Sequence, residues 1–277
     1  MTDGRGTTTL PPLLYGTAWK EEATEGLVTQ ALAAGFRGID TANQRKHYFE
    51  AGVGAALQAA LARGDVQRGE LFVQTKFTFA RGQDARLPYD PTASIGDQVR
   101  QSFTSSQTHL GLRFIDSLVL HGPTNAEGLH RNDHEAWRAM EALVTEGVVA
   151  SLGISNTSAA QLEELVAFAS VRPRFVQNRC YASRGWDAHV RAVCREHGII
   201  YQGFSLLTAN GPVVNGREVK GMAARYGVTP AQVIFRFAQQ LGMLPLTGTS
   251  DPRHMAADLA ATSIPLAAAD VAHLERG

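Results

Sequence analysis

The segment EEATEGLVTQALAAGFRGID, residues 21–40, contains the unit from which we expect the fold to be built. Leu27, Ala31 and Ala34 recur at spacings of three and four residues, which is typical of a helix with one apolar face, and Gly35 is placed to end that helix. The short apolar run that follows has the length of a buried strand. Alternation of such helices and strands is typical of a parallel sheet.

Apolar runs of this kind recur along the chain, each followed by a segment with helical periodicity. The expected strands lie within residues 13–16, 36–40, 71–76, 116–121, 149–155, 174–178, 199–204 and 242–248. In TPAQVIFRFAQQLG, Thr229 is placed as the N-cap, Pro230 as the first helical residue and Gly242 at the end. Eight strand–helix pairs in about 250 residues match a (β/α)8 TIM barrel, here a single domain over residues 1–277, and a doubly wound open sheet is the alternative.

The composition limits the partners that the chain can have. Its 26 basic and 26 acidic residues cancel, so no overall positive field attracts nucleic acid or an anionic membrane surface. No stretch approaches the roughly 20 apolar residues that span a bilayer, and the N-terminal residues lack the apolar core of a signal peptide. We therefore expect a cytoplasmic protein that is a monomer or a weak homo-oligomer.

The cysteines and histidines do not form a recognisable metal motif. Cys180 and Cys194 are the only cysteines and occur in no metal-ligand spacing, and a reducing compartment suits them. His130 and His134 lie four residues apart in HRNDHE, but no third ligand is evident, whereas catalytic zinc usually has three. We expect no metal centre.

Polar residues stand where four successive strands are expected to end. Asp40 ends the second strand, Lys76 the third and His121 the fourth, while Ser155 and Asn156 end the fifth. Each of them alone has a structural explanation as a helix cap, a solvated charge or a hydrogen-bonded interior group. In a TIM barrel, however, the C-terminal strand ends form the catalytic face. Together these residues favour a catalytic site.

The residue types in this group indicate a particular reaction. Asp40 and Lys76 can pair at a water-poor barrel mouth, and a nearby Tyr48 would feel a cation that stabilises its phenolate. Tyr48 is then a proton donor near neutral pH, and His121 can hydrogen-bond the same substrate oxygen. Delivery of a proton to an oxygen while its carbon accepts a hydride is carbonyl reduction.

Six ordered motifs extend over nearly the whole chain. They are GTAWK from Gly16, GFRGIDTA, LFVQTK, DSLVLHGP, AWRAMEALVTEGVVASLGISN and TPAQVIFRF. In this order and at these spacings, they resemble the aldo-keto reductase family. The resemblance implies Asp40, Tyr48, Lys76 and His121 as a catalytic tetrad, with Tyr48 the general acid and a nicotinamide cofactor giving its hydride directly to the substrate.

The resemblance also implies residues that hold the nicotinamide. Ser155, Asn156 and Asn178 would hold its carboxamide, and Phe204 would stack on its ring. Asn178 stands where the family usually has Gln, and Phe204 where it usually has Tyr. Both replacements keep the chemistry, an amide for an amide and a flat ring for a flat ring.

The remaining cofactor contacts follow from the same resemblance. Ser205, Leu207 and Thr208 would lie along the pyrophosphate, and Thr247, Arg253 and His254 near the adenosine phosphate end. The family commonly has a Lys on the eighth strand that contacts the ribose 2′-phosphate, where this chain has Leu246. The habit of the family favours NADP, and NAD is the alternative.

Two features of the loops depart from the family pattern. Tyr48 follows Asp40 by eight residues where the usual spacing is five, so His47 competes with it as the proton donor. The segment TFARGQDARLPYDPTA, residues 78–93, is long for a loop, and a second irregular stretch covers residues 206–219. Only SIPLAAADVAHLERG, enough for one short helix, follows the last strand–helix unit, so we expect a pocket that is open on that side.

The substrate pocket can be assigned only in part. Trp19 stands where the family has an aromatic pocket wall, and His47 is a further candidate from the loop after the second strand. Phe79, together with Tyr89, can supply a wall from residues 78–93, or this segment is an ordinary surface loop. The substrate itself would be a small carbonyl compound.

Two other functions are compatible with the same residues. Lys76 at a strand end can serve as the nucleophile of a Schiff-base lyase or aldolase. Alternatively, the chain is a nucleotide-binding regulatory barrel with little turnover. Borohydride trapping on Lys76 would favour the first, and tight cofactor binding without turnover the second.

Overall fold

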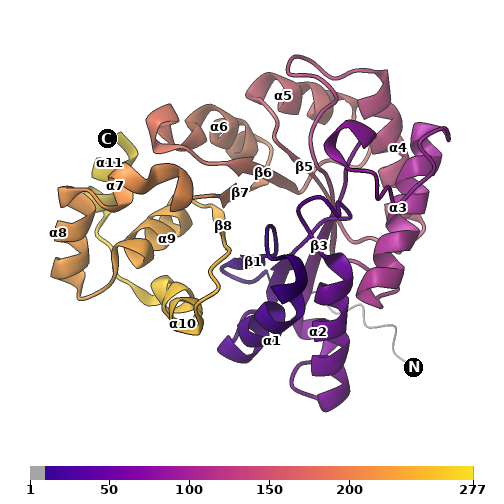
Figure 1. The fold of residues 1–277 in the computed structure, drawn as a ribbon. Helices are drawn as coiled ribbons and strands as arrows, with labels where there is room; N and C mark the ends of the chain where they lie inside the picture. The colour runs from indigo at the N-terminus through magenta and orange to yellow at the C-terminus, as the bar shows by residue number, and fades with distance from the viewer. Residues whose placement is uncertain (1–9, 277) are drawn as a thin grey trace.

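The computed structural model describes residues 10–276, which contain a closed barrel of eight parallel strands (Figure 1). The strands are β1 Leu14–Gly16, β2 Gly38–Asp40, β3 Phe72–Phe77, β4 Ser117–Leu120, β5 Leu152–Ser155, β6 Phe175–Arg179, β7 Ile200–Phe204 and β8 Leu244–Thr247. Each strand pairs in parallel with the next, and β8 pairs with β1 to close the ring. The predicted TIM barrel is confirmed, and the open-sheet alternative is wrong.

Helices surround the barrel, and at least one follows every strand (Figure 1). They are α1 Thr24–Ala34, α2 Glu50–Arg63, α3 Ile95–Leu110, α4 Arg131–Thr145, α5 Ala159–Phe168, α6 Ala188–Glu196, α7 Gly211–Val214, α8 Arg217–Tyr226, α9 Pro230–Gln240, α10 Pro252–Ala260 and α11 Ala268–Arg276. Residues 206–219 were expected to be irregular but contain α7 and the start of α8, both of which contact α9. α7 is only four residues long, too short for helical periodicity to reveal it.

The helix ends follow the local chemistry of the sequence. Gly35 ends α1 with φ +108°, a left-handed conformation that glycine adopts without a steric penalty. Thr229 is the N-cap of α9, its hydroxyl accepts a hydrogen bond from the Gln232 backbone N–H, and Pro230 follows as the first helical residue. Gly35, Thr229 and Pro230 therefore stand at the helix ends where the sequence placed them, whereas α9 ends at Gln240, before Gly242.

An apolar layer of buried side chains lies in the barrel bore. Its buried members come from β1, β3, β6 and β8, and they are Leu14, Phe72, Phe175, Leu244 and Leu246. The rings of Phe72 and Phe175 meet edge to face with centroids 5.5 Å apart. Gly38 lies beside this layer, and a Cβ at that position would be 2.4 Å from Leu14 Cδ2. A glycine is therefore needed for the layer to close.

A polar layer follows two residues further along the strands, because side chains on one face of a strand recur every second residue. Its buried members are Asp40, Gln74, Ser117, Gln177 and Gln202. Gln74 Nε2 donates to Asp40 Oδ1 at 2.7 Å and to Gln202 Oε1 at 2.8 Å. Gln177 Nε2 donates to the same two oxygens, each at 2.9 Å. The amides tie β2, β3, β6 and β7 together across the bore.

Two further observations concern the chain as a whole. Cys180 and Cys194 are both free and buried. Within residues 10–276, no single helix is long and apolar enough to cross a membrane, and only one bent pair, residues 252–263 with 268–276 at 115°, meets the length and composition. In that pair, α10 packs against α1 and α9, and α11 packs against α9.

Candidate active site

A cavity of about 610 Å³ opens at the C-terminal ends of the strands. One part lies over the bore and is lined by Asp40, Tyr48, His121, Ser155 and Gln177. The other part runs outward between the N-terminal half of α9 and α10, and its lining includes Thr229, Ala231, His254, Ala257 and Asp258. We call the second part the outer arm. The cavity therefore joins the polar layer of the bore to the surrounding helices.

Asp40 and Lys76 form a buried ion pair at the base of this cavity. Lys76 Nζ lies 2.7 Å from both Asp40 carboxylate oxygens and 2.8 Å from the Thr41 carbonyl oxygen, so its three N–H groups all have acceptors. Burial lowers the pKa of Lys76, while Asp40 acts in the opposite direction. Lys76 does not line the cavity. An enclosed, paired ammonium is not available as a nucleophile, so the Schiff-base alternative is not supported.

Tyr48 lines the cavity, and its ring lies beside both the ion pair and His121. Lys76 Nζ is 5.1 Å from the ring centroid, and the His121 ring is 5.9 Å away at 69°. Burial raises the pKa of Tyr48 well above its ordinary value, and the Asp40 charge adds to the shift. The sequence predicted a lowered pKa for Tyr48, but Asp40 neutralises the charge of the nearby Lys76. The hydroxyl is therefore protonated at neutral pH, and no residue among 10–276 hydrogen-bonds to it.

His121 lies at the end of β4 and contributes a second polar group to the cavity. Its Nδ1 is 2.7 Å from Thr78 Oγ1, and its carbonyl oxygen accepts a hydrogen bond from Asn156 Nδ2 at 2.8 Å. Burial lowers the pKa of His121 to about 3, with a further contribution from the Lys76 charge. The imidazole is neutral at physiological pH. When the Thr78 hydroxyl donates to Nδ1, the ring proton is on Nε2 and can be given to a ligand.

The loop between β2 and α2 places the side chains of the adjacent residues Tyr48 and His47 in different surroundings. The backbone N–H groups of both residues donate to the Gln44 carbonyl, at 2.9 Å and 3.1 Å, so the additional residues form a turn. His47 is placed against Trp19, with ring centroids 3.9 Å apart, and does not itself line the cavity. Trp19 does line it and is 69% exposed. The turn directs Tyr48 toward the cavity and His47 toward the outer rim.

The carboxamide-binding residues expected on β6 need a correction. Ser155 and Asn156 line the cavity, but Asn178 does not. Its side-chain oxygen accepts a hydrogen bond from the Thr157 backbone N–H at 3.1 Å, outside the bore. Gln177 occupies the cavity wall instead. Because successive strand residues point to opposite faces, a shift of one residue in the assignment exchanges an inner for an outer side chain.

Most of the remaining predicted cofactor residues line the cavity together. They are Phe204, Ser205, Leu207, Thr208, Thr247 and His254. Arg253 does not line it: its side chain is 88% exposed and pairs with Asp251 at 2.7 Å. Arg253 follows the start of α10 by one residue, and its neighbour His254 lines the cavity while remaining exposed to solvent.

The loop after β3 does not form a cavity wall. Phe79 and Tyr89 are buried against Phe77, with ring centroids 5.2 Å and 5.7 Å from it, and neither lines the cavity. The Tyr89 hydroxyl donates to the Thr78 carbonyl at 2.7 Å. The loop is thus held by its own small core, and its aromatic residues are not substrate contacts in this conformation.

One ionisable residue of the outer arm, Asp258, was not predicted from the sequence. Asp258 is 3% exposed, lines the cavity and accepts a hydrogen bond from Thr247 Oγ1 at 2.7 Å. It follows His254 by four residues on α10, a spacing that places both on one helix face. That spacing was the available signal.

The backbone around the cavity is strained at three positions. Trp19, Asn156 and Ser205 line the cavity and have φ values of 63°, 52° and 56°. Non-glycine residues adopt this left-handed conformation at a cost of about 1–3 kcal/mol, and such residues cluster at functional sites. The strain therefore points to this cavity independently of the side-chain chemistry.

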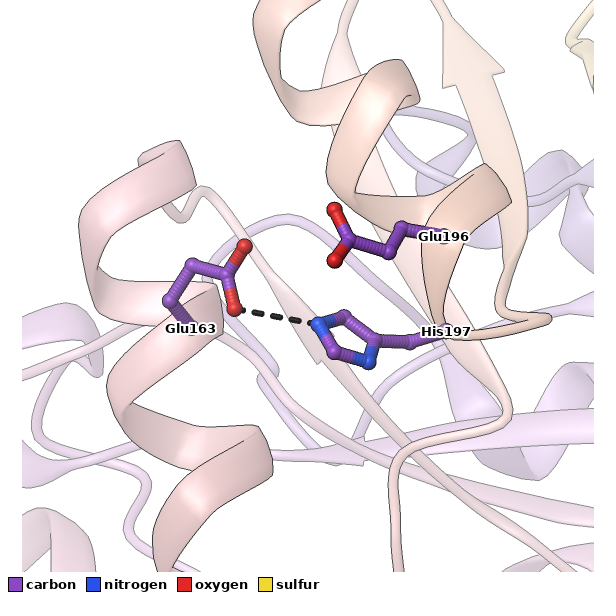
Figure 2. A group of neighbouring side chains, drawn as sticks. All are labelled: Glu163, Glu196 and His197. Carbon is purple, nitrogen blue, oxygen red and sulfur yellow. Dashed lines mark hydrogen bonds and ion pairs between the residues drawn. The ribbon is translucent and has the colours of Figure 1, made fainter.

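One group among the described residues could ligate a metal, and it lies outside the cavity. It consists of Glu163 on α5, Glu196 at the end of α6 and the adjacent His197 (Figure 2). His197 Nε2 already pairs with Glu163 Oε2 at 3.0 Å, and both glutamates are exposed. His130 instead lies at the N-cap of α4, and the His134 ring packs against Phe168.

Comparisons with known proteins agree with this geometry. The model of the aldo/keto reductase family matches residues 6–276. An aldo-keto reductase of Mycolicibacterium vanbaalenii is 30% identical over 269 residues, which cover 96% of this chain and 88% of the relative. The NAD/NADP-dependent indole-3-acetaldehyde reductase of Schizosaccharomyces pombe is 30% identical, covering 89% and 81%.

Solved structures show the same fold. An aldo/keto reductase from Brucella melitensis superimposes with a TM-score of 0.80 at 25% identity, covering 96% of this chain and 95% of that one. The aldose reductase of Schistosoma japonicum superimposes with a TM-score of 0.83 at 21% identity, covering 97% and 88%. With a family model that spans nearly the whole sequence, the chain belongs to the aldo/keto reductase family.

Proposed function

We propose that this aldo/keto reductase converts an aldehyde or ketone to an alcohol, with Tyr48 as the general acid. The observation that carries the proposal is that Tyr48 lines the cavity and that its hydroxyl has no hydrogen-bond partner among the described residues, while burial raises its pKa and keeps it protonated. A group in that state can give its hydrogen bond, and then its proton, to a substrate oxygen.

The residues of the cavity suit a nicotinamide dinucleotide. Phe204 offers a half-buried ring, and the polar side chains of Ser155, Asn156 and Gln177 meet at the same part of the cavity wall. Amides and hydroxyls can satisfy a carboxamide, and an aromatic face can stack on a flat ring. When bound, the cofactor supplies the hydride that the substrate carbon accepts.

The protein residues account for the proton. Tyr48 gives the hydroxyl proton to the carbonyl oxygen, which becomes the alcohol once the carbon has accepted the hydride. The neutral His121 donates a hydrogen bond to the same oxygen and orients it. The Tyr48 phenolate that remains lies beside the Lys76 ammonium, which Asp40 keeps in place. Solvent then returns the proton to Tyr48.

The function is tested by incubating the purified protein with NADH or NADPH and a panel of reactive aldehydes and ketones. We expect the absorbance of the reduced nicotinamide to fall only when both protein and carbonyl are present, with one alcohol formed per cofactor oxidised. Tight dinucleotide binding by folded protein without turnover on any carbonyl would contradict the proposal and support a regulatory barrel.

We further propose a cytoplasmic protein that is a monomer or a weak homo-oligomer. Two free, buried cysteines suit a reducing compartment. Trp19, at the cavity rim, is the one large hydrophobic residue that is exposed within residues 10–276, so no broad apolar surface favours association. Light scattering during size-exclusion chromatography checks the oligomeric state.

A further inference from the structure

The outer arm of the cavity has an unusual charge for a site that would take a dinucleotide. No lysine or arginine lines the cavity within residues 10–276. The ionisable residues that line the outer arm are His254 and Asp258. A dinucleotide whose nicotinamide lies near Tyr48 must extend its adenosine half away from the bore, and the outer arm is where the cavity continues.

Asp258 faces this arm as a buried carboxylate without a cationic partner. Thr247 Oγ1 donates to Oδ2 at 2.7 Å, and no ion pair joins Asp258 to any described residue. Burial raises the pKa of Asp258 to about 6, although the Thr247 hydrogen bond and His254 act against that shift. The carboxyl is therefore mostly ionised at pH 7.5, with Oδ1 free to accept a hydrogen bond.

Two cations next in the chain to cavity-lining residues are paired elsewhere. Arg253 Nη2 and Nε contact the two Asp251 carboxylate oxygens at 2.7 Å and 3.2 Å, on the exposed side of α10. Lys20 Nζ donates to the Gly248 carbonyl at 2.6 Å and lies 5.0 Å from the Tyr15 ring centroid, outside the cavity lining. On β8, the cavity meets the apolar side chain of Leu246.

The negative charge of Asp258 and the lack of lining cations distinguish an adenosine ribose with a 2′-phosphate from one with a free 2′-hydroxyl. A 2′-phosphate carries a charge of about −1.5 to −2 near pH 7 and requires cations or several N–H donors. Placed beside an ionised carboxylate in a partly buried site, it is repelled. A free 2′-hydroxyl, in contrast, can donate a hydrogen bond to a carboxylate oxygen.

We propose that Asp258 selects the 2′-hydroxyl of the adenosine ribose in the outer arm, so that NAD(H) is the preferred cofactor. This inference rests on the proposed function. It assigns NAD, the alternative given by the sequence, as the preferred cofactor in place of NADP. Leu246 supports the same selection, because it presents no charge to a phosphate.

The test is a binding measurement that does not depend on turnover. Isothermal titration calorimetry of the full chain with NAD⁺, NADP⁺, 5′-AMP and 2′,5′-ADP gives four dissociation constants. We expect NAD⁺ to bind at least about tenfold more tightly than NADP⁺, and the two adenosine probes to differ in the same direction. Asp258→Asn keeps an acceptor for Thr247 but removes the charge, and it should reduce the NAD⁺ preference at least about threefold.

Two further variants make the interpretation specific. Leu246→Lys should strengthen NADP⁺ binding about tenfold, with a smaller effect on NAD⁺, because the new ammonium reaches the arm from β8. Asp65→Asn removes an exposed carboxylate that pairs with Arg63 away from the cavity, and it should leave both constants unchanged. Thermal melting confirms that each variant is folded.

The outcomes separate the two proposals. Tighter binding of NADP⁺ than of NAD⁺ by the wild type overturns the inference and leaves the proposed function intact. An unchanged ratio in folded Asp258→Asn overturns the role of Asp258. If the folded wild type binds neither dinucleotide, the proposed function and this inference are both rejected.

Discussion

The apolar layer and the polar layer of the bore perform different tasks, and on β3 and β6 their members lie two residues apart. On β3, Phe72 of the apolar layer is followed by Gln74, and on β6 Phe175 is followed by Gln177. The apolar layer stabilises the barrel through burial. The polar layer must satisfy every donor and acceptor it buries, and it holds Asp40 in a defined position for the site above.

Stability and catalysis can therefore be changed separately in this barrel. A change in the apolar layer outside Leu246, which lines the cavity, should lower the free energy of unfolding with little effect on the chemistry. A change in the polar layer should affect both, because the same hydrogen bonds that satisfy buried groups also orient the catalytic residues.

Lys76→Met should have a large effect on both properties. It leaves the Asp40 carboxylate buried without its cation, which typically costs about 3–5 kcal/mol of stability. Carbonyl reduction should fall at least about 100-fold, since the Tyr48 phenolate loses its neighbouring charge. Urea unfolding and steady-state kinetics measure the two effects. The double variant Asp40→Asn with Lys76→Met should regain stability but not activity, and retention of activity in either variant would contradict the account.

Phe175→Ala tests the other layer. Removal of a fully buried ring that packs on Phe72 should lower the free energy of unfolding by about 3–5 kcal/mol. The kcat of the folded protein should remain within about threefold of the wild type, because Phe175 lies outside the cavity. Phe175→Leu provides a milder change in the same direction. A loss of kcat as large as that of Lys76→Met would remove the distinction between the layers.

Gln177→Met is expected to have an intermediate effect. The side chain keeps its approximate volume but loses the hydrogen bonds to Asp40 and Gln202, which should cost about 1–3 kcal/mol of stability. Activity should fall about tenfold or less, because Lys76 and Gln74 still hold Asp40. As a matched control, Asn178→Ala changes the adjacent residue on the outer face and should leave KM for the cofactor unchanged. A raised KM for the cofactor in Asn178→Ala, with unchanged activity in Gln177→Met, would show that Asn178 contacts the cofactor.

The pH dependence of stability provides a further test at the cavity end of β4. The pKa of His121 is about 3 in the folded protein, below its ordinary value of 6.5, so the unfolded chain binds one more proton in between. The contribution of this pKa difference to the free energy of unfolding is complete above pH 6.5. It is lost as the pH falls, at about 1.4 kcal/mol per pH unit. His121→Gln should flatten the urea stability profile by that amount between about pH 6 and pH 4. An unchanged slope would mean that His121 is protonated in the folded state.

Much of the fold could be predicted from the sequence, because buried parallel strands are short apolar runs separated by periodic helices. The strand ends could also be predicted, since Asp40, Lys76 and His121 interrupt otherwise apolar runs. Which residue of β6 lines the cavity could not be predicted, because the neighbouring residues Gln177 and Asn178 both carry an amide. Only the register of the strand determines which of them points into the bore. Asp258 was missed because its function depends on a contact with another element.

The loop after β2 shows a similar limit. Tyr48 and His47 are adjacent in the sequence, and both can donate a proton, so spacing alone did not distinguish them. The turn that both residues form with the Gln44 carbonyl places one ring in the cavity and the other against Trp19. That outcome depends on the three-dimensional path of the loop, which the local sequence does not encode in a recognisable motif.

Whether Tyr48 supplies the proton is decided by comparing kcat for Tyr48→Phe and His47→Gln with the same aldehyde and cofactor. The Tyr48 hydroxyl has no partner among residues 10–276, so its removal should leave stability nearly unchanged. We predict that Tyr48→Phe lowers kcat about 10²–10⁴-fold and that His47→Gln remains within about tenfold of the wild type. A large loss in His47→Gln, with activity retained in Tyr48→Phe, would contradict the account.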